Sequence, residues 1–319
     1  MSNAYPKKTP PKSIAIFGGG GRINSHTAQY LRYKTPETKL RLLGSSAASV
    51  QALREKFPDH DIMQANYFDP SSLGPALEGM EAALIVTPSG LDERVAMTNF
   101  IEAARKADSL THIIRLVGYA PESTPDNLPA HLREHGGDGD QHYVAKALLQ
   151  SSGLPVTFVN LAASLFDNYM ITAGPIRESH TLVWPQRYVP VMDVRDLGEI
   201  IARIFLSDDA RHIGSFHSVN NGYDCLTTFE FAEVMSNAFM TPISTDTSWE
   251  SFNAAYGEFF KAKWGRENEA QYRFDHCRYE FEHVFMPPLS NFAESILGRR
   301  PNTLHNWLVE HRKHFLPDS

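Results

Sequence analysis

A run of four glycines, 18–21, is the feature of this chain that points most directly to chemistry. It follows a short apolar segment, 13–17, and precedes a segment whose apolar residues have helical spacing. A strand, a glycine turn and a helix in this order direct backbone N–H groups and a helix N-terminus at a pyrophosphate. A glycine-rich loop without a ligand is the alternative. We predict that a dinucleotide binds at Gly18, Gly20, Gly21, Arg22 and Ile23.

The residues after the second predicted strand, 39–44, bear on which dinucleotide is bound. An acid at this point hydrogen-bonds the ribose hydroxyls of NAD, whereas a basic residue accommodates the 2′-phosphate of NADP. Ser45 and Ser46 are neither, but their hydroxyls can hydrogen-bond a phosphate, and Arg22 can supply positive charge. We therefore expect NADP as the cofactor, with NAD as the alternative.

Two further predicted strands also end in polar residues. Asn66 follows the segment 62–65, and its amide can both donate to and accept from an adenine ring. Thr87 and Pro88 end the segment 82–87 in a turn whose backbone we expect along the nicotinamide ribose. A plain strand-to-helix turn is the alternative. Because ligands of open parallel sheets bind beyond the C-terminal strand ends, we predict all three residues at the cofactor site.

Apolar segments with strand and helix periodicity alternate through the first half of the chain. The predicted strands are 13–17, 39–44, 62–65, 82–87, 112–117 and 156–160. The predicted helices after the first one are 49–57, 73–77, 91–107 and 143–151. Regular β–α alternation implies a parallel sheet with helices on both faces. The fold class we predict is α/β, a doubly wound parallel sheet of the Rossmann type.

The pattern changes after about residue 161. Further strands are predicted at 187–192 and 215–220, and further helices at 193–206, 229–239, 249–264, 274–285 and 301–315. This part is mainly helical, and the helix at 249–264 is rich in aromatic residues. Such a cluster either packs as core or forms the wall of a pocket for a flat organic substrate.

These patterns suggest a division of the chain into domains. Residues 1–12 are polar and read as a disordered leader. We predict a dinucleotide-binding domain at 13–165, to which 187–221 returns. A smaller, mainly helical substrate-binding domain is predicted from 166–186 and 222–319.

Composition excludes several other classes of protein. The chain of 319 residues has 30 Lys and Arg against 37 Asp and Glu, a net charge of −7, whereas nucleic-acid binders usually carry a basic face. It has two cysteines, and no Cys/His spacing resembles a metal site. No apolar run approaches the roughly 20 residues that span a bilayer. We expect a cytoplasmic protein with no metal, nucleic-acid or membrane partner.

Short motifs along nearly the whole chain resemble those of the NmrA-like family of atypical short-chain dehydrogenases/reductases. The glycine loop stands where that family has Gly-x-x-Gly-x-x-Gly, with Asn24 at the third glycine. We expect Asn24 to displace the first helix slightly or to cap it. The other motifs are Asp69-Pro70, Ser152-Gly153-Leu154-Pro155, Phe166-Asp167-Asn168, Asp193-Val194-Arg195-Asp196-Leu197-Gly198 and Leu297-Gly298-Arg299-Arg300-Pro301. The two aspartates of the Asp193 motif are expected to cap a helix rather than to act in catalysis.

The resemblance also implies candidate catalytic residues. Alignment on 152–154 places His142 where relatives carry a lysine or histidine facing the nicotinamide, and imidazole titrates near neutral pH. Other short-chain dehydrogenases use Tyr-x-x-x-Lys, in which the lysine lowers the pKa of the tyrosine. Tyr143 and Lys146 are one residue too close for that spacing. Tyr119, just after the fifth strand, is a further candidate proton donor. Each of the four has the alternative of a plain structural or solvent-exposed residue.

The resemblance leaves three functions open. The first is an NAD(P)H-dependent reductase of a small aromatic or quinone-like substrate, and the aromatic last third of the chain favours it. The second is a non-catalytic NAD(P)-binding redox sensor, which the incomplete Tyr–Lys pair favours. The third is an isomerase or lyase that keeps the nucleotide as a fixed or recycled cofactor. A homodimer is a further expectation.

Overall fold

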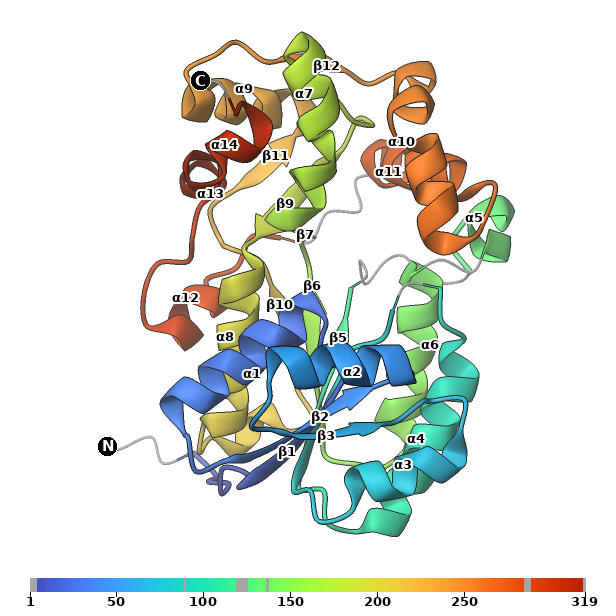
Figure 1. Ribbon diagram of the computed structural model, residues 1–319, viewed down its shortest axis with the longest axis vertical. Helices are drawn as coiled ribbons and strands as arrows, with labels where there is room; N and C mark the ends of the chain where they lie inside the picture. Colours follow the sequence, from blue (N-terminus) through green and yellow to red (C-terminus); the bar gives the residue numbers. More distant parts are fainter. Residues whose placement is uncertain (1–4, 89, 119–125, 136–137, 284–287, 318–319) are drawn as a thin grey trace.

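The computed structural model describes residues 5–88, 90–118, 126–135, 138–283 and 288–317. The lower half of the molecule in Figure 1 is built around a seven-stranded sheet in the order β10-β6-β5-β4-β1-β2-β3, and every pairing in it is parallel. Its strands are β1 (Ser13–Phe17), β2 (Lys39–Gly44), β3 (Asp61–Gln64), β4 (Ala82–Ile85), β5 (His112–Val117), β6 (Val156–Leu161) and β10 (Phe216–Val219). This order confirms the predicted doubly wound sheet.

Helices cover both faces of this sheet and bury two separate apolar cores (Figure 1). One face carries α1 (Arg22–Lys34), α2 (Ala47–Lys56), α8 (Val194–Leu206) and α12 (Phe292–Leu297). The other face carries α3 (Pro70–Leu77), α4 (Glu93–Ala107) and α6 (Asp138–Ser151). The central strands β1, β4 and β5 are buried along their whole length, which is why their sequences are mainly apolar.

Helices α1 and α8 cross at very close range. A Cβ added at Gly198 would lie 2.7 Å from Cβ of His26 and 2.9 Å from the backbone nitrogen of Thr27. A side chain at this position would therefore push the two helices apart. The crossing sets the position of α1, whose first turn follows the glycine loop.

The upper half of the molecule is built from short strands and helices (Figure 1). Its strands are β7 (Ser164–Leu165), β9 (Tyr188–Met192) and β11 (Cys225–Thr227) in one sheet, and β8 (Thr181–Val183) paired with β12 (Ser244–Asp246) in another. Its helices are η1 (Phe166–Thr172), α7 (Ala173–Ser179), α9 (Thr228–Phe239), α10 (Trp249–Trp264), α11 (Glu269–His283), α13 (Leu304–Glu310) and α14 (Arg312–Phe315). Helix α5 (Ala130–His135) lies beside α11, and η2 (Ala210–His212) precedes β10.

The predicted helix at 301–315 is wrong as a single element. The side chain of Thr303 accepts a hydrogen bond from the backbone of Asn306 and starts α13. His311 leaves the helical conformation at φ −101° and ψ 10°, and its Nδ1 lies 2.8 Å from the carbonyl oxygen of Trp307. The chain therefore turns at His311, and Phe315 of α14 enters the core.

The first described residues, expected to belong to a disordered leader, contact the end of α8. The backbone N–H of Lys8 donates to the carbonyl of Asp208 at 2.8 Å, and its ammonium donates to the carbonyl of Phe205 at 2.9 Å. Among the described residues, no helix is both long and apolar enough to cross a bilayer.

Candidate cofactor and substrate site

The glycine loop connects β1 to the N-terminus of α1 through a turn that needs glycine. Gly18 has φ +64°, a left-handed conformation that other residues rarely adopt. The N–H of Gly21 closes the turn on the carbonyl of Gly18 at 2.9 Å, and Gly21 is the N-cap of α1. No side chain caps this helix end within the described part of the chain, so the first N–H groups of α1 are available to an anion. These features fit a pyrophosphate.

The side chain of Asn24 hydrogen-bonds the glycine loop and does not cap the helix. Its amide donates to the carbonyl of Phe17 at 2.7 Å and to that of Gly18 at 3.0 Å, and the residue is 2% exposed. The expectation that Asn24 caps the helix is therefore wrong, because Gly21 is the N-cap and no side chain of the described residues caps α1. The amide nitrogen is thus satisfied by the last carbonyl of β1 and by the first carbonyl of the loop, while Oδ1 is buried and has no hydrogen-bond partner among the described residues.

The next two strand ends lie at the expected edge of the sheet. Ser46 is the N-cap of α2 and exchanges hydrogen bonds with Ser49, while Ser45 remains exposed beside it. Asn66 uses its carboxamide oxygen in its own turn, where it accepts from the N–H of Phe68 at 2.9 Å. Ser45 thus remains the better candidate of the two serines for a phosphate contact.

The turn after β4 is hydrogen-bonded to a buried ion pair through the hydroxyl of Thr87. The guanidinium of Arg115 lies 2.5 Å from the Glu93 carboxylate and 2.8 Å from the Thr87 hydroxyl, and Thr87 also donates to Glu93. Arg115 is 0% and Glu93 is 1% exposed. The N–H of Glu93 donates to the side chain of Gln141 on α6 at 3.0 Å. The network joins the Thr87 turn to β5, α4 and α6.

Three buried polar atoms around this ion pair have no hydrogen-bond partner among the described residues. They are Oε2 of Glu93, Nε of Arg115 and the hydroxyl of Tyr67. Burial raises the pKa of Tyr67, and the charges of Arg115 and Glu93 act on it as well. Buried polar groups of this kind are commonly hydrogen-bonded by an internal water molecule.

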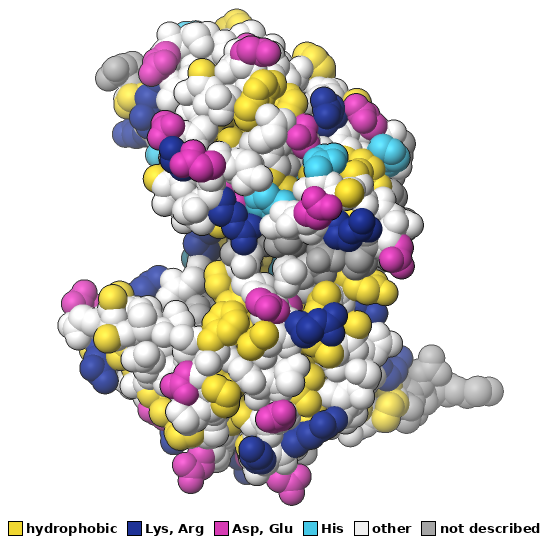
Figure 2. All heavy atoms as spheres, turned by 90° about the vertical axis from the view of Figure 1, so that its right-hand side faces the viewer, with side chains coloured by type: hydrophobic (Ala, Val, Ile, Leu, Met, Phe, Trp, Pro, Cys, Tyr) yellow, Lys and Arg dark blue, Asp and Glu magenta, His cyan; other side chains and the backbone are white. Residues whose placement is uncertain are grey.

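Beyond the C-terminal strand ends lies a cavity of about 760 Å³ that contacts both halves of the molecule. Figure 2 shows the surface indented between the two halves. Gly118, at the end of β5, and Arg22, at the start of α1, line the cavity from the lower half. Its aromatic lining from the upper half is Trp184, Phe252, Phe259, Phe260, Trp264 and Tyr272.

Helix α10 contributes to both the core and the cavity. Phe252, Tyr256 and Phe260 are buried, and the Tyr256 hydroxyl donates to the carbonyl of Val183 at 2.9 Å. Phe259 is 46% exposed and lines the cavity with Trp264. Phe252 and Phe260 belong to the core and also line the cavity, so both interpretations of the aromatic cluster hold.

A polar group from α11 and its neighbours lies among these rings. Arg187 contacts Glu280 at 3.0 Å, and His276 lies 3.7 Å from the same carboxylate. Burial would raise the pKa of Glu280, but His276 and Arg187 lower it to about 2. Burial raises the pKa of the neighbouring Cys277 thiol, which disfavours a reactive thiolate.

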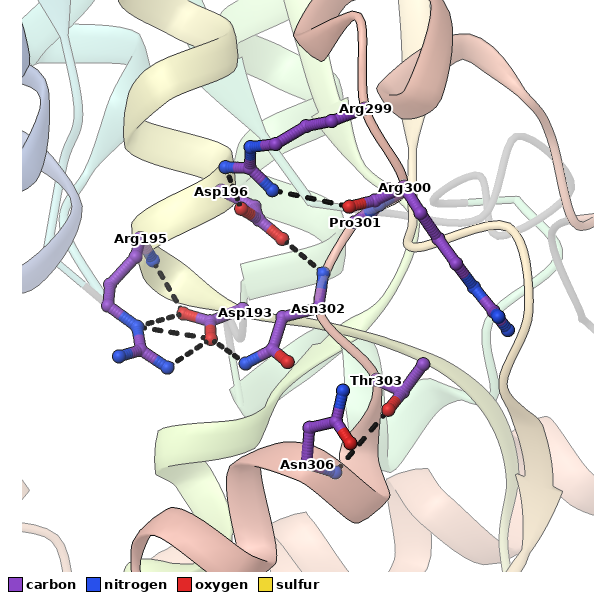
Figure 3. A pocket seen from close by; sticks show the side chains of 9 residues that line it. All are labelled: Asp193, Arg195, Asp196, Arg299, Arg300, Pro301, Asn302, Thr303 and Asn306. Carbon is purple, nitrogen blue, oxygen red and sulfur yellow. Dashed lines mark hydrogen bonds and ion pairs between the residues drawn. The ribbon is translucent and has the colours of Figure 1, made fainter.

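A second, polar cavity of about 600 Å³ lies where α8 meets the segment after α12 (Figure 3). Asp193 caps α8 by accepting from the N–H of Arg195 at 2.8 Å, which confirms the predicted capping role. Asp196 accepts from Arg299 at 2.7 Å and from the N–H of Asn302 at 2.6 Å. Figure 3 shows both carboxylates directed at these partners rather than into open space. We interpret the cluster as a structural junction.

Comparison with characterised proteins gives two curated relatives. No family model matches the chain. Quinone oxidoreductase 2 of Escherichia coli (strain K12) is 26% identical over 161 residues, which are 50% of this chain and 51% of that protein. NAD(P)H azoreductase of Xenophilus azovorans is 25% identical over 234 residues, 72% of this chain and 75% of that protein. The chain thus spans about half the length of the first relative.

Solved structures match over nearly the whole chain. Triphenylmethane reductase of Citrobacter sp., complexed with NADP(H), has a TM-score of 0.74 at 18% identity, covering 94% of this chain and 99% of that one. The NADPH complex of an Escherichia coli quinone oxidoreductase has a TM-score of 0.73 at 20% identity, with the same coverage. NmrA, a negative transcriptional regulator in complex with NAD, has a TM-score of 0.68 at 15% identity, covering 96% of this chain and 95% of that one. The chain has the NmrA-like fold. The resemblance seen in the motifs is confirmed at the level of the fold.

On this NmrA-like fold, His142 lies on α6 and contacts Gly118, the residue that follows β5. The N–H of Gly118 donates to its Nδ1 at 2.8 Å. The same Nδ1 lies 3.2 Å from the carbonyl oxygen of Gly118. Because the shorter contact is to an N–H group, which can only donate, we assign the proton of the neutral ring to Nε2. Gly118 lines the large cavity, whereas His142 contacts Gly118 and is not itself among the described residues that line the cavity.

The other predicted catalytic residues are not gathered with His142. Tyr143 is 37% exposed on α6. The ammonium of Lys146 donates to Gln150 at 2.9 Å and lies 5.9 Å from the ring of Phe158 in β6. Neither lines the cavity among the described residues. Tyr119 lies outside the described residues.

Arg22 is held on the cavity side of the NmrA-like glycine loop. Its guanidinium donates to Oδ1 of Asn168 at 3.0 Å and lies 3.7 Å from Asp167. Burial raises the pKa of Asp167, and the Arg22 charge opposes this. To reach a 2′-phosphate beside Ser45, Arg22 would have to leave these partners.

Two features of the site were missed from the sequence. Arg115 lies in a segment that otherwise reads as an apolar strand, and a charged residue inside such a run is a signal for a buried partner. Glu280 and His276 are spaced four apart on α11 and share one side of it with Arg273. That spacing is visible in the sequence, but the sequence does not show that this side of α11 faces Arg187, which precedes β9.

Proposed function

We propose that the protein is an NADPH-dependent reductase of a small aromatic or quinone-like compound. The cavity carries this proposal, because aromatic rings on α10 and α11 face a dinucleotide loop and the end of β5 across about 760 Å³. Ligand pockets for small molecules have volumes of roughly 300–1,000 Å³. The names of the quinone oxidoreductase and the azoreductase support the same chemistry for this chain.

The residues that would hold the cofactor follow the edge of the sheet. The pyrophosphate fits the uncapped start of α1, the adenosine end fits Ser45 and Asn66, and the nicotinamide ribose fits the turn at Thr87 and Pro88. When bound, the nicotinamide supplies a hydride. Solved relatives with NADP(H) support NADP as the cofactor, and NAD is the alternative that the NmrA complex supports.

His142 is our proposed proton donor. Its Nδ1 accepts from Gly118, so Nε2 is the atom that carries the transferable proton. General acid catalysis of this kind typically contributes about 10²–10⁴-fold to rate. We expect His142→Ala to lower kcat at least about tenfold while NADPH affinity stays nearly constant. Tyr143→Phe and Lys146→Met are matched changes on the same helix. Full activity in His142→Ala would remove His142 from the mechanism and make Tyr119 or Tyr143 the next candidate, and a larger loss in Tyr143→Phe or Lys146→Met would assign the role to the residue changed.

The function is tested by following NADPH absorbance with a panel of quinones and azo compounds. We expect oxidation of NADPH that depends on both enzyme and acceptor. Phe259→Ala should raise KM for these acceptors, because it removes an exposed ring of the cavity wall. No turnover with any aromatic acceptor would contradict the proposal.

A second candidate function is a dinucleotide sensor, which the likeness to NmrA with NAD favours. The two functions differ in cofactor preference. A reductase should bind the reduced form at least as tightly as the oxidised form, whereas a sensor can prefer the oxidised one. Calorimetry with both redox forms of NADP and NAD distinguishes them.

Three further parts of the proposal concern organisation. We propose that residues 13–165 with 187–221 bind the dinucleotide and that 166–186 with 222–319 bind the substrate; β9, within the first set, pairs with β7 and β11 in the upper half. We also propose a cytoplasmic location and a homodimer. Sedimentation tests the oligomeric state, and cell fractionation tests the location.

A further inference from the structure

Lys263 is a cation in the wall of the large cavity, on the last turn of α10. Its ammonium lies 4.5 Å from the centre of the Trp264 ring and 5.3 Å from that of Phe259. Both rings also line the cavity. The positive charge is therefore placed at the edge of an aromatic surface.

The other cations of the cavity have acidic partners. Arg187 pairs with Glu280 at 3.0 Å, and Arg273 pairs with Glu269 at 2.7 Å. Arg22 lies 3.7 Å from Asp167. No carboxylate of the described residues forms an ion pair with Lys263.

The electrostatic surroundings of Lys263 also favour the binding of an anion beside it. Partial burial, followed by the charges of Arg22 and Arg273, lowers the pKa of this largely exposed lysine. A bound anion beside Lys263 would relieve this repulsion.

We propose that Lys263 binds an anionic substituent, a carboxylate or a sulfonate, on the aromatic substrate. The inference rests on the proposed function and narrows its substrate class to aromatic anions. The flat ring of the substrate lies against the α10 wall, and its charged group contacts the ammonium. A cofactor phosphate is the other source of anions near Arg22. We favour the substrate because Lys263 projects from the aromatic wall of the upper half rather than from the loop that holds the dinucleotide.

The experiment is calorimetry on the protein saturated with NADP⁺. The probes are naphthalene-1-sulfonate and the uncharged 1-naphthol. We expect Lys263→Met to weaken sulfonate binding by about tenfold, the low end for a charge-assisted contact because the lysine is exposed, and to change naphthol binding less than about twofold. Raising the salt to about 1 M should shrink the difference, because exposed charges are screened there.

Lys261→Met is the matched control. Lys261 lies on the same helix, pairs with Glu267 at 2.8 Å and does not line the cavity. It should leave both affinities unchanged.

Three outcomes would overturn the inference. The first is an equal loss of affinity for the sulfonate and for naphthol in Lys263→Met, and the second is no binding of the sulfonate to the wild-type protein. The third is a loss of NADP⁺ affinity in Lys263→Met while the ratio of the sulfonate and naphthol affinities stays as in the wild type. The last would assign Lys263 to the cofactor. Because these measurements need no turnover, an absence of NADPH oxidation would count against the proposed function alone.

Discussion

Acid should destabilise this protein through His112, a histidine at the start of β5 that is 1% exposed. The Thr157 hydroxyl donates to the carbonyl of His212 at 2.7 Å, so it accepts from Nε2 of His112 at 2.9 Å. The neutral ring therefore carries its proton on Nε2. Its Nδ1 is buried and has no hydrogen-bond partner among the described residues, and a second proton would have to go there.

The size of the effect follows from the pKa. Burial, with the charges of Lys8 and His212, lowers the pKa of His112 from 6.5 to about 3. The unfolded chain binds this proton more readily than the folded one, so the contribution to stability is complete above the unfolded pKa and is lost as the pH falls toward the folded pKa. At 1.36 kcal/mol per pKa unit, the free energy of unfolding should fall by about 2 kcal/mol between about pH 8 and about pH 5.

The assay is urea unfolding followed by tryptophan fluorescence at these two pH values. In His112→Gln the amide nitrogen can still donate to Thr157, but the side chain does not titrate. The wild type should lose about 2 kcal/mol more than this variant. His217, whose burial lowers its pKa to about 4, titrates in both proteins, so its effect cancels in the comparison. Equal losses in the two proteins would refute the role of His112.

Three further changes test other parts of the structure. Arg115→Met leaves Glu93 buried without its partner and should lower the free energy of unfolding in urea by about 3–5 kcal/mol. Adding Glu93→Gln to the same chain should restore part of this loss. A loss below about 1 kcal/mol would show that the ion pair is not buried as described. Gly21→Val should abolish dinucleotide binding in calorimetry with the fold retained by circular dichroism, because a side chain there starts 3.2 Å from the Gly18 carbonyl, in the turn that we propose binds the pyrophosphate. Unchanged affinity would place the cofactor elsewhere. Arg22→Ala should shrink the preference for NADP over NAD if Arg22 reaches the 2′-phosphate; a preference changed less than about threefold would leave Arg22 with Asn168.

The sequence predicted the parts of this protein whose structure is decided locally. Apolar runs such as 112–117 are strands because the backbone alternates faces and both faces are buried. The glycine loop was predictable because Gly18 requires a left-handed turn. The split of 301–315 was not, since His311 turns the chain in response to Trp307 and the core beneath it. The partner of Arg115 was likewise hidden, because Glu93 is distant in the sequence and reaches it through the packing of α4 on β5.

The close crossing of α1 and α8 has a consequence for how the protein is made on the ribosome. Val194, the first residue of α8, follows the last residue of α1, Lys34, by 160 residues. At a synthesis rate of roughly 5–20 residues per second, about 8–32 s pass between the synthesis of α1 and that of the helix that covers it. Strand β10, which completes the edge of the large sheet, emerges later still. A growing chain stopped after β6 would expose the apolar side of α1 around Ala28 and Leu31, so nascent chains of this length are where a chaperone would be needed.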